Sequence, residues 1–168
     1  MANGWLNFCG KNAHDTPQNQ TMASGITGTD ECVTEYEKFK LQNGAGNREK
    51  RAFLIFRIKD EKIVLCETGS ETASWSDFVE TMSSNPKDGA YGIYDFKVKT
   101  PDERLLQKII FVAWAPDSGL PIKAKMIYAA AREPFKQQLG SGLAYVIQAT
   151  DMAELDEKTI ADMVVKGR

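Results

Sequence analysis

Apolar residues follow two different periods along this chain, and the period changes from segment to segment. In some segments they recur at every third or fourth position, which is typical of a helix that packs one face on a core. In others, short runs rich in β-branched and aromatic residues are typical of strands. We expect helices at 30–42, 75–82, 118–139 and 156–165, and strands at 51–59, 62–68, 91–98, 108–114 and 144–149.

Capping and turn residues fix several of these boundaries. Ser74 followed three positions later by Asp77 is an acidic capping box, which predicts a helix start. The pair Asp60-Glu61 between two strands predicts a tight hairpin. The long helix is expected to start at Asp117 or Ser118, since either residue type can cap a helix N-terminus.

The order of the expected elements is helix, two strands, helix, two strands, long helix, strand, helix. No internal repeat or second linker divides this order, and 168 residues suffice for one domain that buries roughly two-thirds of its unfolded surface. A mixed sheet with helices packed on its faces is the simplest layering that buries all the apolar faces. The sequence therefore predicts a single-domain α/β fold.

The long helix, PIKAKMIYAAAREPFKQQL (residues 121–139), has one apolar strip more than a helix on a soluble core needs. At 100° per residue, one side carries Ala124, Ile127, Tyr128, Ala131, Phe135 and Leu139, a second strip carries Ile122, Met126 and Ala130, and Lys125, Arg132 and Lys136 lie between them. Only one strip can face the core. Pro134 has no N–H to donate to Ala130, so we also expect the helix to bend there.

Composition and charge narrow the classes of function. Hydrophobic residues make up 42% and charged residues 26% of the chain, as in ordinary globular proteins. With 21 basic and 23 acidic residues, the net charge of −2 gives no nucleic-acid-binding footprint. No apolar run approaches the roughly 20 residues of a membrane span. The cysteines Cys9, Cys32 and Cys66 include no CxxC pair, so we expect neither a zinc site nor a disulfide framework, and a reducing compartment.

The first 21 residues are rich in Asn, Gln and Gly, and we interpret residues 1–21 as a flexible N-terminal extension. They lack the basic start and the apolar stretch of a secretory signal. Met22 followed by Ala-Ser-Gly would make a natural start, so the extension is either native or an artefact of the gene boundary. The folded domain is expected to span residues 22–168.

Groups able to perform catalysis are scarce. The only histidine, His14, lies in the extension, which excludes a Ser/His/Asp or Cys/His arrangement on the folded body and all but excludes a histidine metal site. Asp117 and Asp151 stand where helix caps belong. Cys32 and Cys66 fall on a helix and a strand, where cysteine is most often a small core residue. We therefore expect no enzyme, no cofactor and no metal, and turn to surface recognition.

Five stretches of the chain are similar to the actin-depolymerising factor/cofilin family, in the family's order. They are MASGI (22–26), DECVTEYEKFKL (30–41), YGIYDFKVKT (91–100), KIIFVAWAPDSGLPIKAKMIYAAAR (108–132) and IQATDMAEL (147–155). The resemblance implies an ADF-homology domain, a mixed sheet of five or six strands between helix pairs. It also implies a monomeric protein of the cytoplasm and actin cytoskeleton, which binds actin monomers and filaments, prefers ADP-actin, and severs or depolymerises filaments.

The resemblance also implies which residues contact actin monomers, because in the family the long helix inserts into a cleft between two actin subdomains. The residues carried over by position are Ser24, Gly25, Ile26, Lys123, Lys125, Met126 and Ile127. A helix in an apolar groove needs anchors at i and i+4 with flanking charge, and methionine adapts to irregular pockets. The lysines suit an acidic partner and would raise the association rate. The alternative is that Met126 belongs to the core and the lysines only solvate the helix.

Two regulatory sites are implied by the same resemblance. A serine at the position of Ser24 can be phosphorylated in the family, and the added negative charge would block binding to an acidic partner. Phosphoinositides inhibit the family through basic surface residues, each worth about 1 kcal/mol near an anionic surface. The residues of this chain that could supply such a patch are Lys123, Lys125, Arg132 and Lys136.

The implied filament contacts are where this sequence departs from the family. The basic residues carried over are Arg104, Lys108, Lys166 and Arg168. Leu105 and Leu106 occupy positions where the family usually has basic residues. Met163 lies near a position where the family often has an arginine, and methionine cannot make the charge contacts of a guanidinium. We expect monomer binding with weaker filament binding. Two alternatives stay open: an ADF-homology module that holds filaments without severing them, and a phosphoinositide- or partner-binding adaptor, supported only by the cluster at 5–8.

Overall fold

The computed structural model describes residues 25–42 and 50–167. The predicted extension, Ser24 and Arg168 lie outside the described residues. The helices are α1 (Asp30–Leu41), α2 (Trp75–Ser83), α3 (Ile122–Leu139) and α4 (Glu157–Lys166), with a short 3-10 helix, η1 (Met152–Leu155). The strands are β1 (Thr27–Gly28), β2 (Arg51–Lys59), β3 (Lys62–Ser70), β4 (Ala90–Lys99), β5 (Leu105–Trp114) and β6 (Leu143–Ala149).

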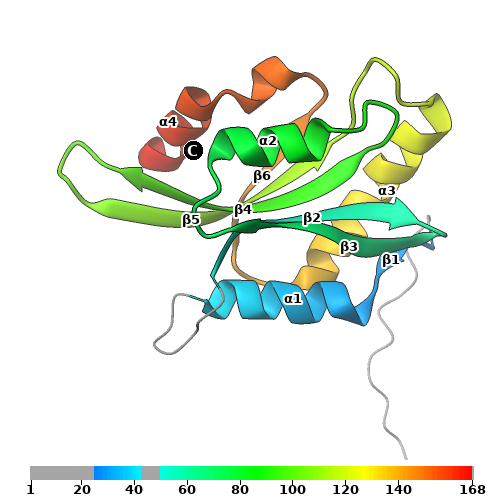
Figure 1. Cartoon of the computed structure of the whole chain (residues 1–168), viewed down its shortest axis with the longest axis horizontal. Helices are drawn as coiled ribbons and strands as arrows, with labels where there is room; N and C mark the ends of the chain where they lie inside the picture. The colour runs from blue at the N-terminus through cyan, green and yellow to red at the C-terminus, as the bar shows by residue number, and fades with distance from the viewer. Residues whose placement is uncertain (1–24, 43–49, 168) are drawn as a thin grey trace, which may run out of the picture.

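The strands form one mixed sheet in the order β1-β3-β2-β4-β5-β6. β1 pairs with β3 and β5 pairs with β6 in parallel, whereas the inner pairs are antiparallel. Helices α2 and α4 cover one face of the sheet, and α1 and α3 cover the other (Figure 1). The predicted single mixed sheet between helix layers is confirmed.

Two hydrophobic cores, one on each face, explain why the central strands read as continuous apolar runs. Along β2, Phe53 and Ile55 point into the cluster under α2 and α4, while Leu54 and Phe56 point into the cluster under α1 and α3. Successive side chains of a strand alternate between faces, so a strand covered on both sides needs apolar residues at every position. The sheet is therefore a rigid platform for the helices on both faces.

The local signals at the helix and hairpin starts hold in detail. The Ser74 hydroxyl accepts a hydrogen bond from the Asp77 N–H, and the Asp77 carboxylate accepts one from the Ser74 N–H at 2.8 Å, which completes the capping box. Asp60 and Glu61 have φ of 48° and 60°, as the two central residues of a type I′ hairpin require.

Three features differ from the sequence-based expectation. The long helix begins at Ile122 instead of Asp117 or Ser118, and Asp117 caps no helix. Its carbonyl and carboxylate instead accept hydrogen bonds from Lys125 at 2.7 and 3.3 Å. Asp151 does act as a cap, but of η1, which was not expected. The two-residue strand β1 was also missed, because so short a segment shows no periodicity.

Candidate functional site

The packed side of α3 is the first apolar strip predicted from the sequence. Tyr128, Ala131, Phe135 and Leu139 are buried in the cluster that α3 shares with α1 and the sheet. Ile127 is half-buried and packs against the edge of this cluster. The residue types that repeat at i, i+3, i+4 and i+7 thus fix which side of α3 faces the sheet.

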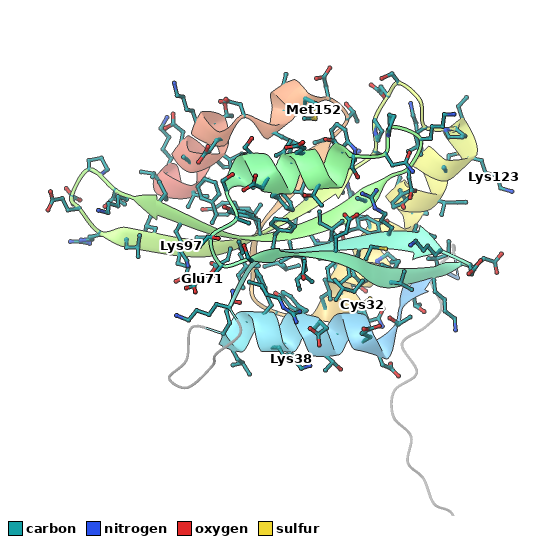
Figure 2. All side chains as sticks on the ribbon, in the orientation of Figure 1. Cys32, Lys38, Glu71, Lys97, Lys123 and Met152 are labelled. Carbon is teal, nitrogen blue, oxygen red and sulfur yellow. The ribbon has the colours of Figure 1, made fainter. Side chains whose placement is uncertain are left out.

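The second apolar strip of α3 lies on the surface. Ile122 is 77% exposed and Met126 is 67% exposed, which excludes the interpretation of Met126 as a core residue. Lys123 is also exposed and its side chain points away from the body of the protein (Figure 2). Two large apolar side chains one helical turn apart, flanked by cations, form the anchor pattern of a helix that inserts into a partner's groove.

The other cations of α3 are tied to neighbouring groups. The Lys125 ammonium is held by Asp117, as described above, and Lys136 pairs with Glu133 at 2.7 Å. Arg132 is half-buried and donates from Nη1 to the side-chain oxygen of Gln148 on β6. The cationic line of the sequence is therefore a set of ordered charges along one edge of α3.

Tyr128 anchors the middle of α3 to the sheet and to the turn that follows α2. Its hydroxyl donates to the Asp88 carboxylate at 2.9 Å and accepts from the Ile58 N–H at 3.1 Å. Burial raises the pKa of Tyr128, so the hydroxyl keeps its proton and its donor role at neutral pH. The Tyr91 hydroxyl, in turn, donates to the backbone carbonyl of Tyr128.

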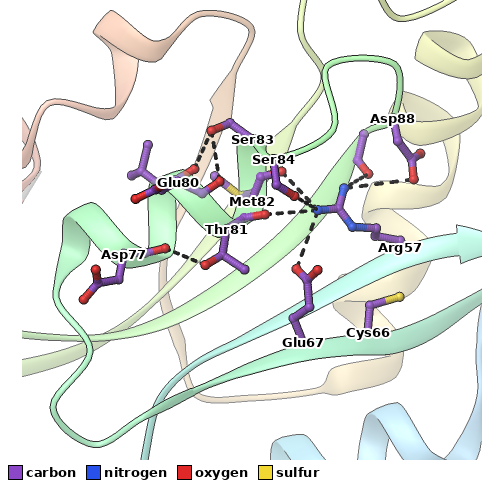
Figure 3. A network of polar contacts seen from close by, with 12 residues as sticks. Arg57, Cys66, Glu67, Asp77, Glu80, Thr81, Met82, Ser83, Ser84 and Asp88 are labelled. Carbon is purple, nitrogen blue, oxygen red and sulfur yellow. Dashed lines mark hydrogen bonds and ion pairs between the residues drawn. The ribbon is translucent and has the colours of Figure 1, made fainter.

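Arg57 extends this hydrogen-bond network to the C-terminal end of α2. This residue is 5% exposed, and its guanidinium donates to the carbonyls of Thr81, Met82 and Gly89 at 3.2 to 3.3 Å (Figure 3). Two of these carbonyls belong to the last turn of α2, where a cation satisfies otherwise unpaired acceptors. Arg57 also lies 4.0 Å from the Asp88 carboxylate. The hydrogen bonds of Tyr128 and Arg57 thus join α2, β2 and α3, the helix that carries the exposed strip.

The N-terminal candidates lie beside the second half of α3. The Gln138 side chain accepts from the Gly28 N–H and donates to the Gly28 carbonyl, both at 2.7 Å. Gly25 is exposed with φ of 63°, in the left-handed region that glycine tolerates. Ile26 is only 7% exposed and belongs to the core under α1 and α3, so its side chain is placed to position the segment.

The filament candidates gather at another end of the molecule. Arg104 and Lys108 are exposed on the β4–β5 hairpin, which extends beyond the helices (Figure 1). α4, which carries Lys166, packs against the same two strands. Leu105 is 62% exposed at the base of the hairpin turn. Met163 is half-buried against the core under α2 and α4.

Clusters of metal-ligating side chains are absent from the part of the chain that the structure describes. There, no group of three or more His, Cys, Asp or Glu side chains could hold a metal ion. Cys32 is buried, as expected, and burial raises the pKa of its thiol. Cys66 is only half-buried, so the expectation of a core residue holds in part. Among the described helices, none is long and apolar enough to cross a membrane.

Comparison with known sequences places the whole described body in one family. The sequence profile of the family described as "Cofilin/tropomyosin-type actin-binding protein" matches residues 25–164. Actin-depolymerizing factor 11 of Oryza sativa subsp. japonica is 40% identical over 136 residues, which cover 80% of this chain and 87% of that protein. Cofilin of Gibberella zeae is 32% identical over 155 residues, covering 86% and 96% of the two chains.

Solved structures agree with the sequence comparison. The crystal structure of Streptomyces griseoflavus cofilin superposes with a TM-score of 0.72 and 26% identity, covering 86% of this chain and 100% of that one. The solution structure of the ADF-like UNC-60A protein of Caenorhabditis elegans gives a TM-score of 0.68 and 26% identity, covering 86% and 97%. The chain belongs to the cofilin/tropomyosin-type actin-binding protein family, as its sequence motifs indicated, and its mixed six-stranded sheet between helices is the cofilin fold.

Proposed function

We propose that this protein binds actin monomers through the exposed strip of α3. The observation that carries the proposal is the exposure of Ile122 and Met126 on a helix whose opposite side is fixed to the core. Lys123 and Lys125 flank the strip, and Ile127 lies at its buried edge. Apolar anchors would fill a groove on actin, and the lysines would accelerate association with its acidic surface.

The N-terminal segment completes the proposed monomer site. Gly28, three residues after Gly25, is held beside the second half of α3 by the Gln138 side chain. Residues 22–168 would form the ADF-homology domain, and phosphorylation of Ser24 would add negative charge beside this site and weaken binding to an acidic partner. Replacing Ser24 by Glu should lower actin affinity relative to Ser24→Ala, and equal affinities of the two variants would refute this switch.

Filament binding and turnover form the second half of the proposal, supported by relatives named actin-depolymerizing factors. Arg104, Lys108 and Lys166 would contact the filament, and we propose a preference for ADP-actin. The exposed Leu105 and the half-buried Met163 supply no charge, so filament contacts would be fewer than a fully basic surface gives. These two residues also favour the second candidate function, a module that holds filaments without severing them.

Anionic lipids are a proposed regulatory partner of the α3 surface. Lys123, Lys125, Arg132 and Lys136 lie along one helix, and Lys123 points away from the protein. A phosphoinositide headgroup bound there would exclude actin from the same face. Sedimentation with vesicles containing phosphatidylinositol 4,5-bisphosphate tests this regulation, and recovery of all the protein in the supernatant at low salt would refute it.

Substitution of the two lysines that flank the exposed strip tests the central proposal. We expect Lys123→Ala with Lys125→Ala to weaken monomer binding at least tenfold, because both charges and the edge of the helix contact are lost. Lys123 is exposed and Lys125 forms a surface ion pair with Asp117, so the double substitution should cost about 1 kcal/mol or less and lower the melting temperature by only a few degrees. Fluorescence of a nucleotide bound to ADP-actin reports the affinity.

The matched control is Lys97→Ala with Lys99→Ala, two exposed lysines two positions apart on the β4–β5 hairpin, at the opposite end of the molecule from the start of α3 (Figure 1). This control should bind actin like the unmodified protein. Unchanged affinity in the Lys123 and Lys125 variant would refute the proposed monomer site, whereas a large drop in its melting temperature would show that the two residues are structural.

A further inference from the structure

β6 (Leu143–Ala149) is an outer strand of the sheet, and only one of its two hydrogen-bonding edges is paired within the described chain. The partner on that edge is β5, which runs parallel to it. The Ala149 carbonyl accepts from the Ala115 N–H at 3.0 Å, so the backbone groups of Ala149 face β5. Backbone groups alternate between the two edges along a strand. The N–H and C=O groups of Gln148 and Val146 therefore face outward, where no other described strand pairs with them.

The sequence of β6 lacks the features that normally keep an outer strand from pairing with another protein. The strand reads LAYVIQA, with no charged residue and no proline, although natural sheets place lysine, proline or a covering segment at such edges. Val146 is 44% exposed, and all the residues of β6 before Ala149 are exposed or half-buried. The irregular step in the pairing with β5 lies at the start of the strand, between Leu143 and Tyr145, so the rest is regular. An exposed, regular and uncharged edge of this kind is a template for a further strand.

β6 is self-complementary when it pairs antiparallel with a copy of itself. With the two-fold axis at Val146, each Val146 lies opposite the other, so that their outward N–H and C=O groups bond reciprocally. Tyr145 lies opposite Ile147, and aromatic and β-branched residues pair favourably across strands. Ala144 lies opposite Gln148, and no like charges oppose each other. We propose that two copies of this chain associate through an antiparallel β6–β6 pair centred on Val146.

The composition of this edge favours a second copy over a charged partner, because β6 offers no charge that would select a basic or acidic peptide. The net charge of −2 adds little repulsion between two copies. One strand pair buries less than the roughly 1,200 Å² of the smallest stable interfaces, so the dimer should form only at high protein concentration. We expect a dissociation constant on the order of 100 µM. The inference rests on β6 alone and is independent of the proposed actin binding.

Sedimentation equilibrium of the full chain tests this association, from about 10 µM to about 1 mM and in a reducing buffer that excludes disulfide crosslinking. We expect the average mass to rise from the monomer toward the dimer across this range. Val146→Lys should raise the dissociation constant at least tenfold, because the two lysines would lie directly opposite each other. Leu105→Lys is the matched control and should leave the dissociation constant unchanged. Leu105 is 62% exposed on β5, before the part of β5 that pairs with β6.

A charge-swapped pair of variants tests the two-fold arrangement itself. Val146→Asp should weaken association as Val146→Lys does, but an equimolar mixture of the two variants places opposite charges across the axis and should associate about fivefold more tightly than either alone. In the unmodified protein, hydrogen exchange at the Gln148 amide should slow as concentration rises. The proposal is overturned if the protein stays monomeric at about 1 mM, if Leu105→Lys weakens association equally, or if the mixture gains nothing. Protection of Gln148 that does not depend on concentration would also overturn it, because a segment of the same chain would then cover the edge.

Discussion

The Tyr128 hydroxyl is a single group that ties α3, the proposed binding helix, to the rest of the protein. It bridges the Asp88 carboxylate and the Ile58 N–H, and both lose a partner when it is removed. We therefore expect Tyr128→Phe to lower the free energy of unfolding by about 1–2 kcal/mol. Tyr145→Phe is the control, since this half-buried hydroxyl has no hydrogen bond within the described residues, and should cost about 0.5 kcal/mol or less. Urea unfolding measures both variants, and equal losses would argue against the bridge.

Individual residues were predictable where the signal is local. The reciprocal bonds of Ser74 and Asp77 depend on four consecutive residues, and the sequence predicted them. Asp117 was expected to cap a helix because its residue type is suitable, yet the chain turns through Gly119 at φ of 99° before the helix begins. Arg57 had no signal at all, because a strand arginine becomes a buried brace only when α2 ends above it.

At the scale of an element, the negative charge of Asp77 in the first turn of α2 should make stability depend on pH. Hydrogen bonds from the Ser74 backbone and hydroxyl lower the pKa of Asp77 below 3.8. A carboxylate whose pKa is lower in the folded state than in the unfolded state stabilises the fold at pH values above its unfolded-state pKa. This contribution is lost as pH falls through the folded-state pKa. Asp77→Asn should therefore lose less unfolding free energy than the unmodified protein as pH falls from about 5 through the folded-state pKa of Asp77.

Chemical denaturation at several pH values measures this difference for α2. Ser76→Ala, an exposed neighbour without a titrating group, is the control and should follow the pH profile of the unmodified protein. Identical acid losses in Asp77→Asn and the unmodified protein would show that the capping carboxylate does not contribute to acid sensitivity.

Element boundaries were predictable where the apolar pattern and the flanking signals agree, but α3 begins four residues later and β5 three residues earlier than expected. β2, α2 and α4 follow their expected ranges to within about two residues, the usual uncertainty of helix and strand ends. β1 has two residues and exists because Gly28 fits against the Phe135 ring, where a Cβ atom would come within 2.7 Å. That contact joins residues more than 100 positions apart, which no local pattern reveals. The expected bend at Pro134 stays a prediction, and α3 continues through this residue to Leu139.

At the scale of the whole molecule, the two proposed actin surfaces are far enough apart to be changed separately. The start of α3 and the β4–β5 hairpin lie at opposite ends of the molecule (Figure 1). Both surfaces were predicted through the family resemblance and stay predictions, and only the structure shows that Leu105 is exposed while Leu106 is half-buried. A charge can therefore be added at Leu105 without disturbing the core.

Adding that charge tests whether the hairpin limits filament binding. We expect Leu105→Lys to increase pelleting with filaments at low salt by about two- to fivefold, the range of one exposed charge pair, and to lose the gain as salt rises. Monomer affinity should stay unchanged because α3 is untouched. Leu41→Lys, at a leucine that is 70% exposed on α1, is the control. If filament ends counted by microscopy rise with pelleting, the hairpin couples binding to severing; if both variants pellet like the unmodified protein, the filament surface lies elsewhere.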